Sequence, residues 1–440
     1  MADANIKKKV PRRIAQAIIG SLKGGVVPRV GLPFVTVGRK HEIEALLRDI
    51  DIIADGGASF RFIAGRYGSG KSFLMQTIRN YAMERGFVVC DADLSPERRL
   101  MGTRGQGLAT YRELVQNLAT RTRPEGGALT LAIDKWISGV EAAVAGNGVS
   151  VTDARFQDEV ERRIFTVIRS MDELVHGFDF ARILTIYCRS YWAGDDEKKS
   201  LVMKWLRGEY QTKTEAKKEL GVNAIVTDDD WYEYLKLFAY FFCQAGYRGM
   251  LVFIDELVNI YRIPNTITRN NNYEKILTMY NDAMQGRARH IGMIMSGTPE
   301  CLEDRRRGVY SYEALRSRLA EGKFAGENMR DMLAPVIHLD PLTPEEMMVL
   351  TEKLRDIHAG LYGYETRVTE DDLSSFVKIE YARVGADRHI TPREIIRDFI
   401  ELLDIVYQHP EKTATDILSS DAFKVSEEKD DGGDFADFVL

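Results

Sequence analysis

One short segment of the 440-residue chain has the residue types and spacing of a phosphate-binding loop. Residues 65–72 read GRYGSGKS and match the pattern GxxxxGK[ST]. Glycines let a backbone wrap around a phosphate with its N–H groups pointing inward, and a following helix adds a favourable dipole. Lys71 is then expected on the β- and γ-phosphates of a nucleotide, and the Ser72 hydroxyl on Mg²⁺. The residues predicted to contact the nucleotide here are Gly65, Arg66, Tyr67, Gly68, Ser69, Gly70, Lys71, Ser72 and Phe73.

A pair of carboxylates follows a second apolar run. Asp255 and Glu256 come directly after residues 250–254, so both emerge where a buried strand ends. In a parallel sheet this is the edge at which the phosphate loop lies. Asp255 is predicted to hold Mg²⁺ through water, and Glu256 to orient or deprotonate the attacking water. A solvated Asp-Glu pair opening a helix is the alternative, which the upstream loop makes less favourable.

Polar residues also follow a third predicted strand, residues 291–296. Ser296 or Thr298 could hydrogen-bond the γ-phosphate or the attacking water, although serine and threonine at strand ends are also common turn formers. Arginines stand further on, at Arg316, Arg318 and Arg393. Most arginines are surface charges, but one supplied across a subunit boundary can stabilise a transferring phosphoryl group.

The elements around these residues predict an α/β fold with a parallel sheet flanked by helices. Residues 60–64 and 87–90 are predicted strands, and a helix over residues 71–85 joins them in a βαβ unit. The αβ pattern stops at about residue 97, continues as mainly helical sequence to about 247, and then resumes.

Beyond about residue 339 only helical patterns are found, over residues 343–359, 369–381 and 391–407, each preceded by a threonine cap. We therefore predict three parts. They are a P-loop ATPase domain over 1–335 with a helical insertion at 97–247, a helical lid over 336–410, and an acidic tail over 411–440 without fixed structure. Phe435, Phe438 and Val439 in the tail could dock on a partner. ATP is expected to bind between lid and core.

Composition limits the remaining classes. The net charge of −6 gives no global basic field, which lowers the expectation of nucleic-acid binding without removing it, because local basic clusters can act alone. Such clusters occur at residues 98–99, 121–123 and 305–307, and at Arg104. No apolar run is long enough for a membrane helix, and we expect no secretory signal because no apolar stretch follows the basic residues 7–13. The four cysteines and seven histidines lack metal-ligand spacing. We expect a cytoplasmic protein that needs no membrane.

Two further strings are Ser-Arg-Leu at residues 317–319 and Thr-Pro-Arg at residues 391–393. Together with the phosphate loop, the Asp-Glu pair and the polar end of the third strand, they resemble an AAA+ ATPase of the origin-recognition type. More closely, the chain is similar to BrxD, the family of ATP-binding proteins of BREX phage-resistance systems. The resemblance runs from about residue 13 to 406. Its most specific strings are FRFIAGRYGSGKS at 60–72, DADLSPERR at 91–99, GQGLATYREL at 105–114, NNYEKILTMYN at 271–281 and YSYEALRSRL at 310–319.

This resemblance implies roles for further residues. Gly38 and Arg39 would lie near the adenine, Thr298 or Ser296 would be the first sensor, Arg318 a finger acting on a neighbouring subunit, and Arg393 the second sensor. The choice between Arg316 and Arg318 stays open. The implied cofactors are ATP and Mg²⁺, and the implied partners are other BREX defence proteins, with further copies of this chain in the active form.

Three functions agree with these features to different degrees. The first is an ATPase that drives action on DNA or on a DNA-bound partner, favoured by an intact Glu256. The second is a slow ATP-gated switch that assembles other defence proteins, favoured by the acidic charge balance and the absence of a helicase motif. The third is a small-molecule kinase, which the separate lid and the Ser-Arg-Leu segment disfavour.

Overall fold

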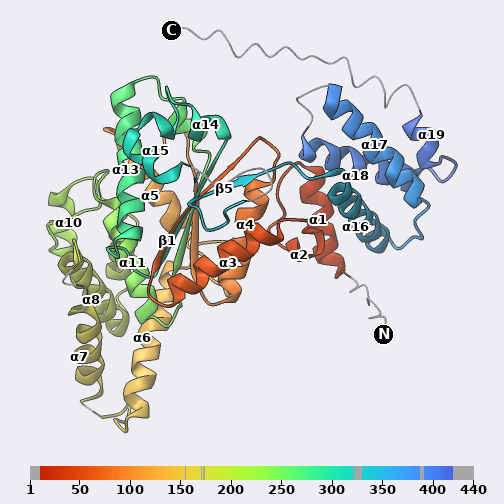
Figure 1. Cartoon of the computed structure of the whole chain (residues 1–440). Coiled ribbons are helices and arrows are strands. Elements are labelled where there is room, and N and C mark those ends of the chain that lie inside the picture. Colours follow the sequence, from red (N-terminus) through yellow and green to blue (C-terminus); the bar gives the residue numbers. More distant parts are fainter. Residues whose placement is uncertain are drawn as a thin grey trace. The chain divides into compact units, whose positions relative to one another are not determined.

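A five-stranded, all-parallel sheet organises residues 40–339 in the computed structural model of the chain (Figure 1). The strand order is β2-β3-β4-β1-β5. The strands are β1 (Ala58–Gly65), β2 (Val88–Asp93), β3 (Met250–Asp255), β4 (Ile291–Gly297) and β5 (Val336–Leu339). The structure describes residues 10–153, 155–169, 171, 174–320, 322, 330–386 and 391–419.

The chain divides into two compact units. The first, called the sheet unit, comprises Lys40–Arg66 and Gly70–Leu339. The second, called the helical unit, comprises the described parts of Met1–Arg39, Tyr67–Ser69 and Asp340–Leu440. In this division the described residues before Lys40 group with the C-terminal helices, and the domain organisation inferred from the sequence stays a prediction.

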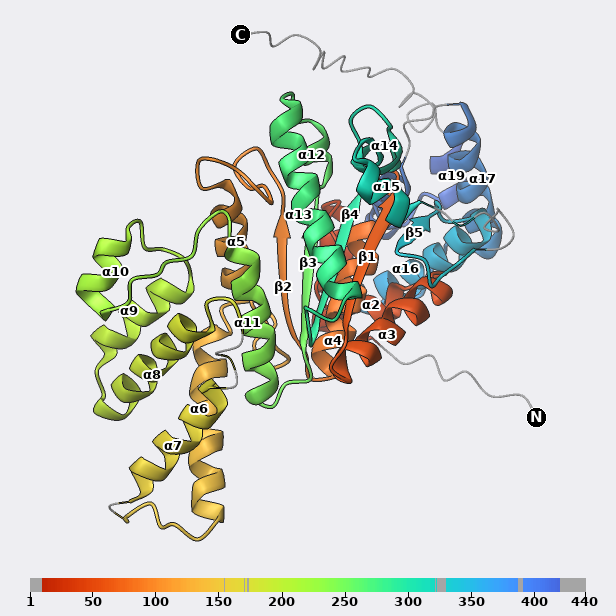
Figure 2. The same ribbon diagram turned by 60° about the vertical axis from the view of Figure 1, so that its left-hand side comes forward.

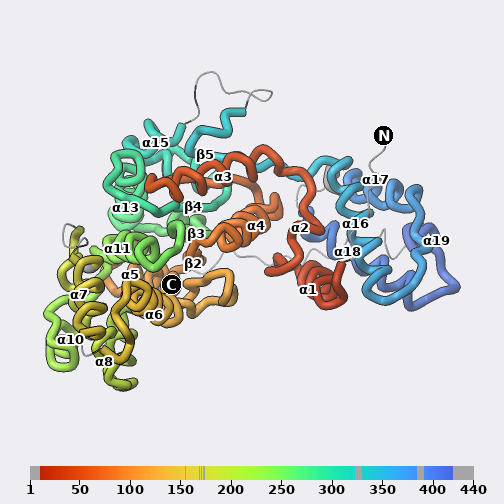
Figure 3. Tube along the Cα trace, turned by 90° about the horizontal axis from the view of Figure 1, so that it is seen from below, coloured from red at the N-terminus to blue at the C-terminus, as the bar shows by residue number. Residues whose placement is uncertain are grey.

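Helices cover both faces of the sheet, as a parallel sheet with apolar strands requires. On one face, β-strand residues such as Ile63 and Phe253 pack against α3 (Lys40–Ala54) and α4 (Lys71–Glu84). On the other, residues such as Phe62 and Val252 pack against α5 (Gln106–Gln116), α11 (Trp231–Gln244) and α13 (Thr266–Met284). Figure 3 shows the two helix layers on either side of the strands. The predicted α/β P-loop NTPase fold is confirmed.

The segment between β2 and β3 is helical, as expected from its sequence. The helices are α5, α6 (Leu129–Gly146), α7 (Phe156–Arg169), α8 (Gly177–Ala193), α9 (Asp196–Leu206), α10 (Lys213–Leu220) and α11. Figure 2 shows α6 and α7 side by side, extending away from the strands. The N-terminal half of α6 packs Ile133, Trp136 and Ile137 into the core, so it is held by tertiary contacts that its composition alone does not reveal.

Strand β5 was not predicted as an element, but it ends at Leu339, the residue beyond which the sequence shows only helical patterns. Its four residues, VIHL, pair with Phe62–Gly65 of β1. So short a run has no periodicity that separates a strand from a loop. Its pairing places residues 336–339 in the sheet unit.

The helical unit contains α1 (Arg12–Lys23), α2 (Leu32–Val35), α16 (Pro344–Tyr362), α17 (Glu370–Ala386), α18 (Pro392–Gln408) and α19 (Ala414–Leu418). Helix α1 packs against α16 and α18 through its buried face, which includes Ile18 and Ile19. Helix α19 lies inside the predicted tail. Residues 420–440, including Phe435, Phe438 and Val439, lie outside the described residues. Within the part of the chain that the structure describes, no helix is both long and apolar enough to cross a bilayer.

A buried hydrogen-bond network joins three helices of the helical unit. His358 on α16 is fully buried, with Nδ1 2.9 Å from the Tyr364 hydroxyl and Nε2 3.0 Å from Asp404 Oδ1. Lys23 on α1 donates to Asp404 Oδ2 at 2.6 Å. Burial lowers the pKa of His358 from 6.5, although its contact with Asp404 opposes the shift. Burial by itself would raise the pKa of Asp404, but hydrogen bonds from His358 and Lys23 outweigh it and the pKa is lowered.

This network predicts acid sensitivity. His358 binds a proton less readily in the native state than in the unfolded chain, so unfolding takes up a proton at low pH. The free energy of unfolding therefore falls as the pH drops below 6.5. The loss is about 1.4 kcal/mol for a pKa lowered by one. The lowered pKa of Asp404 adds a further loss at lower pH. Thermal unfolding can be followed by circular dichroism at pH 7.5 and 5.5. Between these pH values the midpoint temperature should fall less in His358→Gln than in wild type. An equal loss would show that His358 does not titrate on unfolding.

Candidate functional site

The phosphate-loop sequence forms the turn between β1 and α4. Strand β1 ends at Gly65 and α4 begins at Lys71, with Gly68 and Gly70 in the left-handed region at φ +74° and +91°. Side chains rarely adopt this conformation, so glycine is required at both positions. An added Cβ at Gly68 would also lie 2.6 Å from Thr391 Cβ. The sequence therefore builds the loop geometry that its motif implied.

Two groups of this loop fit a bound phosphate. The Lys71 ammonium donates to the carbonyl oxygens of Gly65 and Arg66, at 2.8 and 3.0 Å, so it lies over the loop itself. The Ser69 hydroxyl is buried and has no hydrogen-bond partner among the described residues. Buried hydroxyls normally have a partner, and a phosphate oxygen would supply one. The N-terminus of α4 adds the positive end of the helix dipole, which favours a bound phosphate.

Asp255, at the end of β3, bonds to side chains of α4 and β4. Its Oδ2 accepts from the Ser72 hydroxyl at 2.9 Å, and its Oδ1 accepts from the Ser296 hydroxyl and from the backbone N–H of Glu256, the latter at 2.8 Å. The register explains the contact with Ser296, since β3 and β4 are neighbours and Ile254, just before Asp255, is opposite Met295, just before Ser296. Ser72, Asp255 and Ser296 thus form one polar cluster.

Glu256 follows Asp255 in an unusual backbone conformation. Its φ of +60° lies in the left-handed region, which is uncommon for a residue with a side chain. Such conformations persist where the surrounding structure enforces them, and they are frequent at functional sites. The turn carries the chain from the strand into α12 (Val258–Tyr261) and fixes where the Glu256 side chain starts.

A further carboxylate, Asp93, was missed by the sequence reasoning. The predicted strand stopped at Cys90, whereas β2 continues to Asp93, which is the register partner of Asp255. The pKa of Asp93 is raised to about 6, first by desolvation and then by the charges of Asp255, Asp91 and Glu256. The alternation of polar and apolar residues in Asp91-Ala92-Asp93 is the signal that could have extended the strand.

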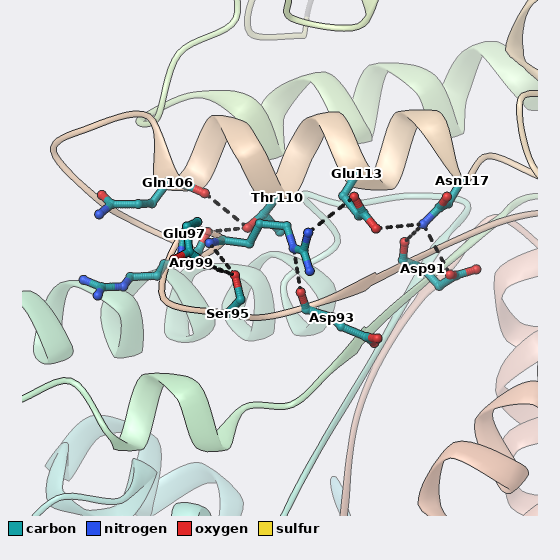
Figure 4. A network of polar contacts seen from close by, with 10 residues as sticks. Asp91, Asp93, Ser95, Glu97, Arg99, Gln106, Thr110, Glu113 and Asn117 are labelled. Carbon is teal, nitrogen blue, oxygen red and sulfur yellow. Dashed lines mark hydrogen bonds and ion pairs between the residues drawn. The ribbon is translucent and has the colours of Figure 1, made fainter. Parts of the chain in front are cut away.

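The loop after Asp93 is held by a polar network that Figure 4 shows. Arg98 Nε donates to the Asp93 carbonyl at 2.9 Å, and its guanidinium lies 3.7 Å from the Glu113 carboxylate on α5. Asn117 donates to the Asp91 carbonyl at 2.9 Å, and the Thr110 hydroxyl donates to the Arg99 carbonyl at 2.6 Å. The residues of the DADLSPERR string therefore hold this strand end against α5.

Ser296 and Thr298, the two candidates for a first sensor, differ in their contacts. Ser296 is fully buried and bonds to Asp255. The Thr298 hydroxyl instead accepts from the backbone N–H of Cys301, at 3.4 Å, and caps α14 (Pro299–Glu303). The geometry connects Ser296 directly with the carboxylate of β3, whereas Thr298 has the capping role that its residue type favours.

Within the helical unit, Arg39 contacts the middle of the phosphate loop. Its guanidinium donates to the Ser69 carbonyl at 2.8 Å and to the Asp340 carbonyl at 2.5 Å. Gly38 lies against Glu346, where any Cβ would overlap the carboxylate. Arg393 is exposed on the first turn of α18, two residues after Thr391, which abuts Gly68. The adenine contact of Gly38 and Arg39 and the sensing role of Arg393 stay predictions.

The two candidate finger arginines have different partners on α15 (Glu313–Leu319). Arg316 forms an ion pair with Glu313 at 2.6 Å. Arg318 is exposed and donates to neutral acceptors, the side-chain oxygen of Asn281 at 3.1 Å and the Ala314 carbonyl at 2.7 Å. Its charge is therefore not compensated by a carboxylate in the described part of the chain, which distinguishes it from Arg316.

A comparison with protein-family models decides the family. The model described as BREX system ATP-binding protein BrxC/D matches residues 10–422. The chain belongs to the BREX BrxC/D family. A search of curated proteins with this sequence gives no significant match. The family match supports the resemblance at the level of BrxC/D and does not separate BrxC from BrxD.

Membership in this family makes the protein a BREX-associated, ATP-binding protein. The phosphate loop and its partnerless Ser69 hydroxyl fit the triphosphate of ATP. Among the described residues no group of three or more His, Cys, Asp or Glu side chains could hold a metal ion by itself. In nucleotide sites Mg²⁺ is usually held by one or two protein ligands together with phosphate oxygens and water. Ser72 and Asp255 are the residues that could take this part.

Proposed function

We propose that this BrxC/D-family protein binds MgATP on Gly65–Ser72 and hydrolyses it at the carboxylates of β3. The observation that carries the proposal is the cluster in which Asp255 joins Ser72 of the phosphate loop to Ser296 of β4. A nucleotide phosphate on the loop would then lie beside both a magnesium-binding pair and Glu256, the arrangement that positions water for attack on a γ-phosphate.

Each residue has a proposed role. Lys71 and the backbone N–H groups of the loop bind the β- and γ-phosphates, and Ser72 and Asp255 hold Mg²⁺, which supplies charge stabilisation on the phosphates. Glu256 orients and deprotonates the attacking water. Ser296 takes the role of first sensor in this proposal, because it bonds to Asp255 whereas Thr298 caps α14.

The strand order, with β4 between β1 and β3, and the separate group of C-terminal helices support an AAA+ ATPase, and the sequence strings given above favour the BrxD type. In that case Arg318 acts on the ATP of a neighbouring copy in a cytoplasmic homo-oligomer, and hydrolysis drives action on DNA or on a DNA-bound complex of BREX proteins. A slow, ATP-gated assembly switch is the second candidate, supported by the net charge of −6.

The loop assignment predicts that Lys71→Ala weakens ATP binding by at least about 100-fold. Charge-assisted hydrogen bonds contribute roughly 1.5–3 kcal/mol each, and the ammonium makes more than one to the phosphates. Equilibrium titration with a fluorescent ATP analogue measures this loss. Lys213→Ala, which removes an exposed lysine from α10, is the matched control and should bind as wild type does. Equal affinity of Lys71→Ala and Lys213→Ala would contradict the assignment.

A further inference from the structure

A turn of the sheet unit carries three consecutive exposed arginines. Arg305, Arg306 and Arg307 lie between α14 and the short 3-10 helix Val309–Ser311, and exposed Arg262 follows α12. Throughout the described ranges no ion pair joins any of these four guanidinium groups to a carboxylate, although the backbone N–H of Arg306 and, in part, the charge of that arginine act on the nearby Asp304 carboxylate and lower its pKa. Other arginines near the site, such as Arg316, are paired with acids. These four positive charges are therefore available to an external anion.

The backbone of this turn is fixed from two sides. Asp304 Oδ1 accepts from the backbone N–H groups of Arg306 and Arg307 at 2.7 and 3.3 Å, and Asp304 Oδ2 accepts from the Tyr261 hydroxyl at 2.9 Å. The Tyr273 hydroxyl donates to the Arg307 carbonyl at 2.5 Å, and the Arg307 guanidinium lies 5.5 Å from the centre of the Tyr261 ring. A turn held in this way loses little conformational entropy when it binds a ligand.

Both segments that build the turn continue from the strands of the proposed ATP site. Strand β3 runs through Asp255 and Glu256 into α12, which supplies Tyr261. Strand β4 runs through Ser296 into α14, which leads to Asp304. Helices α12 and α14 contact each other, and Figure 2 shows them at the same end of the sheet. A change at either strand end would therefore reach the arginines through only one short helix.

We propose that Arg262 and Arg305–Arg307 form a binding site for the phosphodiester backbone of nucleic acid. Guanidinium groups match phosphate oxygens in charge and in paired hydrogen-bond geometry. The hydroxyls of Tyr261 and Tyr273 are already engaged with the turn itself, so the site offers charge without base-reading groups. Contacts of this kind bind independently of sequence. The inference rests on the proposed function in its DNA-acting form and names the surface that would carry it.

The test compares two matched double variants of the full-length protein. Arg305→Gln/Arg306→Gln removes two charges from the turn and keeps Arg307 on Tyr261. The control, Arg287→Gln/Arg289→Gln, removes two exposed charges just before β4, at the opposite end of that strand from the turn. Binding of a fluorescent 30-base-pair DNA duplex of arbitrary sequence is measured by anisotropy at several salt concentrations. ATP turnover without DNA is measured in parallel.

The first variant should bind duplex more weakly, by roughly 10-fold or more at low salt. Its slope of log K against log salt should fall by about two, because each phosphate contact contributes about 0.9. The control variant should keep wild-type affinity and slope. The inference would be overturned if both double variants had the wild-type salt slope. It would also be overturned if the wild-type protein bound no duplex. Competition by polyglutamate equal to that by DNA would also overturn it, in favour of an acidic peptide. If the wild-type protein showed no ATP turnover in the absence of DNA, this would instead contradict the proposed hydrolysis.

Discussion

Arg318→Ala is expected to lower ATP turnover by roughly 10³-fold or more, with ATP binding unchanged. An arginine that a neighbouring subunit inserts beside the γ-phosphate stabilises charge only in the transition state, and such residues contribute about 10³–10⁵ in rate. Arg318 suits this role because it is exposed and bonds only to neutral acceptors, at Asn281 and Ala314. Steady-state phosphate release measures the effect.

Arg316→Ala is the matched control, since it removes a guanidinium two residues away that is already paired with Glu313. It should retain most of the wild-type turnover. If the finger acts across a subunit boundary, mixing Arg318→Ala with Glu256→Gln should restore turnover, because mixed neighbours contain sites with both residues intact. Wild-type turnover by Arg318→Ala, or loss in Arg316→Ala alone, would assign the finger to another residue.

Glu256→Gln is expected to bind ATP as wild type does and to lose turnover by roughly 10²–10⁴-fold, the usual contribution of a positioned general base. Glutamine keeps the size of the side chain and tolerates the backbone turn at φ +60° about as well as glutamate does. Its amide cannot accept the proton of the attacking water. Equilibrium binding and phosphate release, measured on the same preparation, separate the two effects.

The control for this change is Glu274→Gln, an exposed glutamate on α13 that has no proposed contact with ATP. It should match wild type in both measurements. Rapid turnover by Glu256→Gln would exclude the proposed base. Asp93, the register partner of Asp255, would then be the next carboxylate to replace.

The sequence predicts the parts of this site that depend on local patterns. The phosphate loop, β3 and the carboxylates after it are encoded within a few residues each, and the predicted strand at 250–254 differs from β3 by one residue. Parallel strands then bring their carboxyl ends to one edge, which is why the contact between Ser72 and Asp255 follows from separate motifs.

What the sequence does not predict depends on contacts between distant residues. Strand β5 is recognisable only through its pairing with β1, and α1 joins the C-terminal helices through Lys23 and its apolar face. Asp93 was missed because the strand that carries it was ended too early. The difference between Arg316 and Arg318 also depends on a distant residue, Asn281, 37 positions before Arg318.

The most direct test of hydrolysis at this site is phosphate release per protomer across a range of protein concentration. It is measured with Mg²⁺ and with EDTA, and Lys71→Ala serves as the blank. The proposed function predicts turnover that requires Mg²⁺, exceeds the blank and rises with protein concentration as neighbouring copies complete each site. ATP binding without phosphate release above the Lys71→Ala blank would contradict it and would favour the assembly switch.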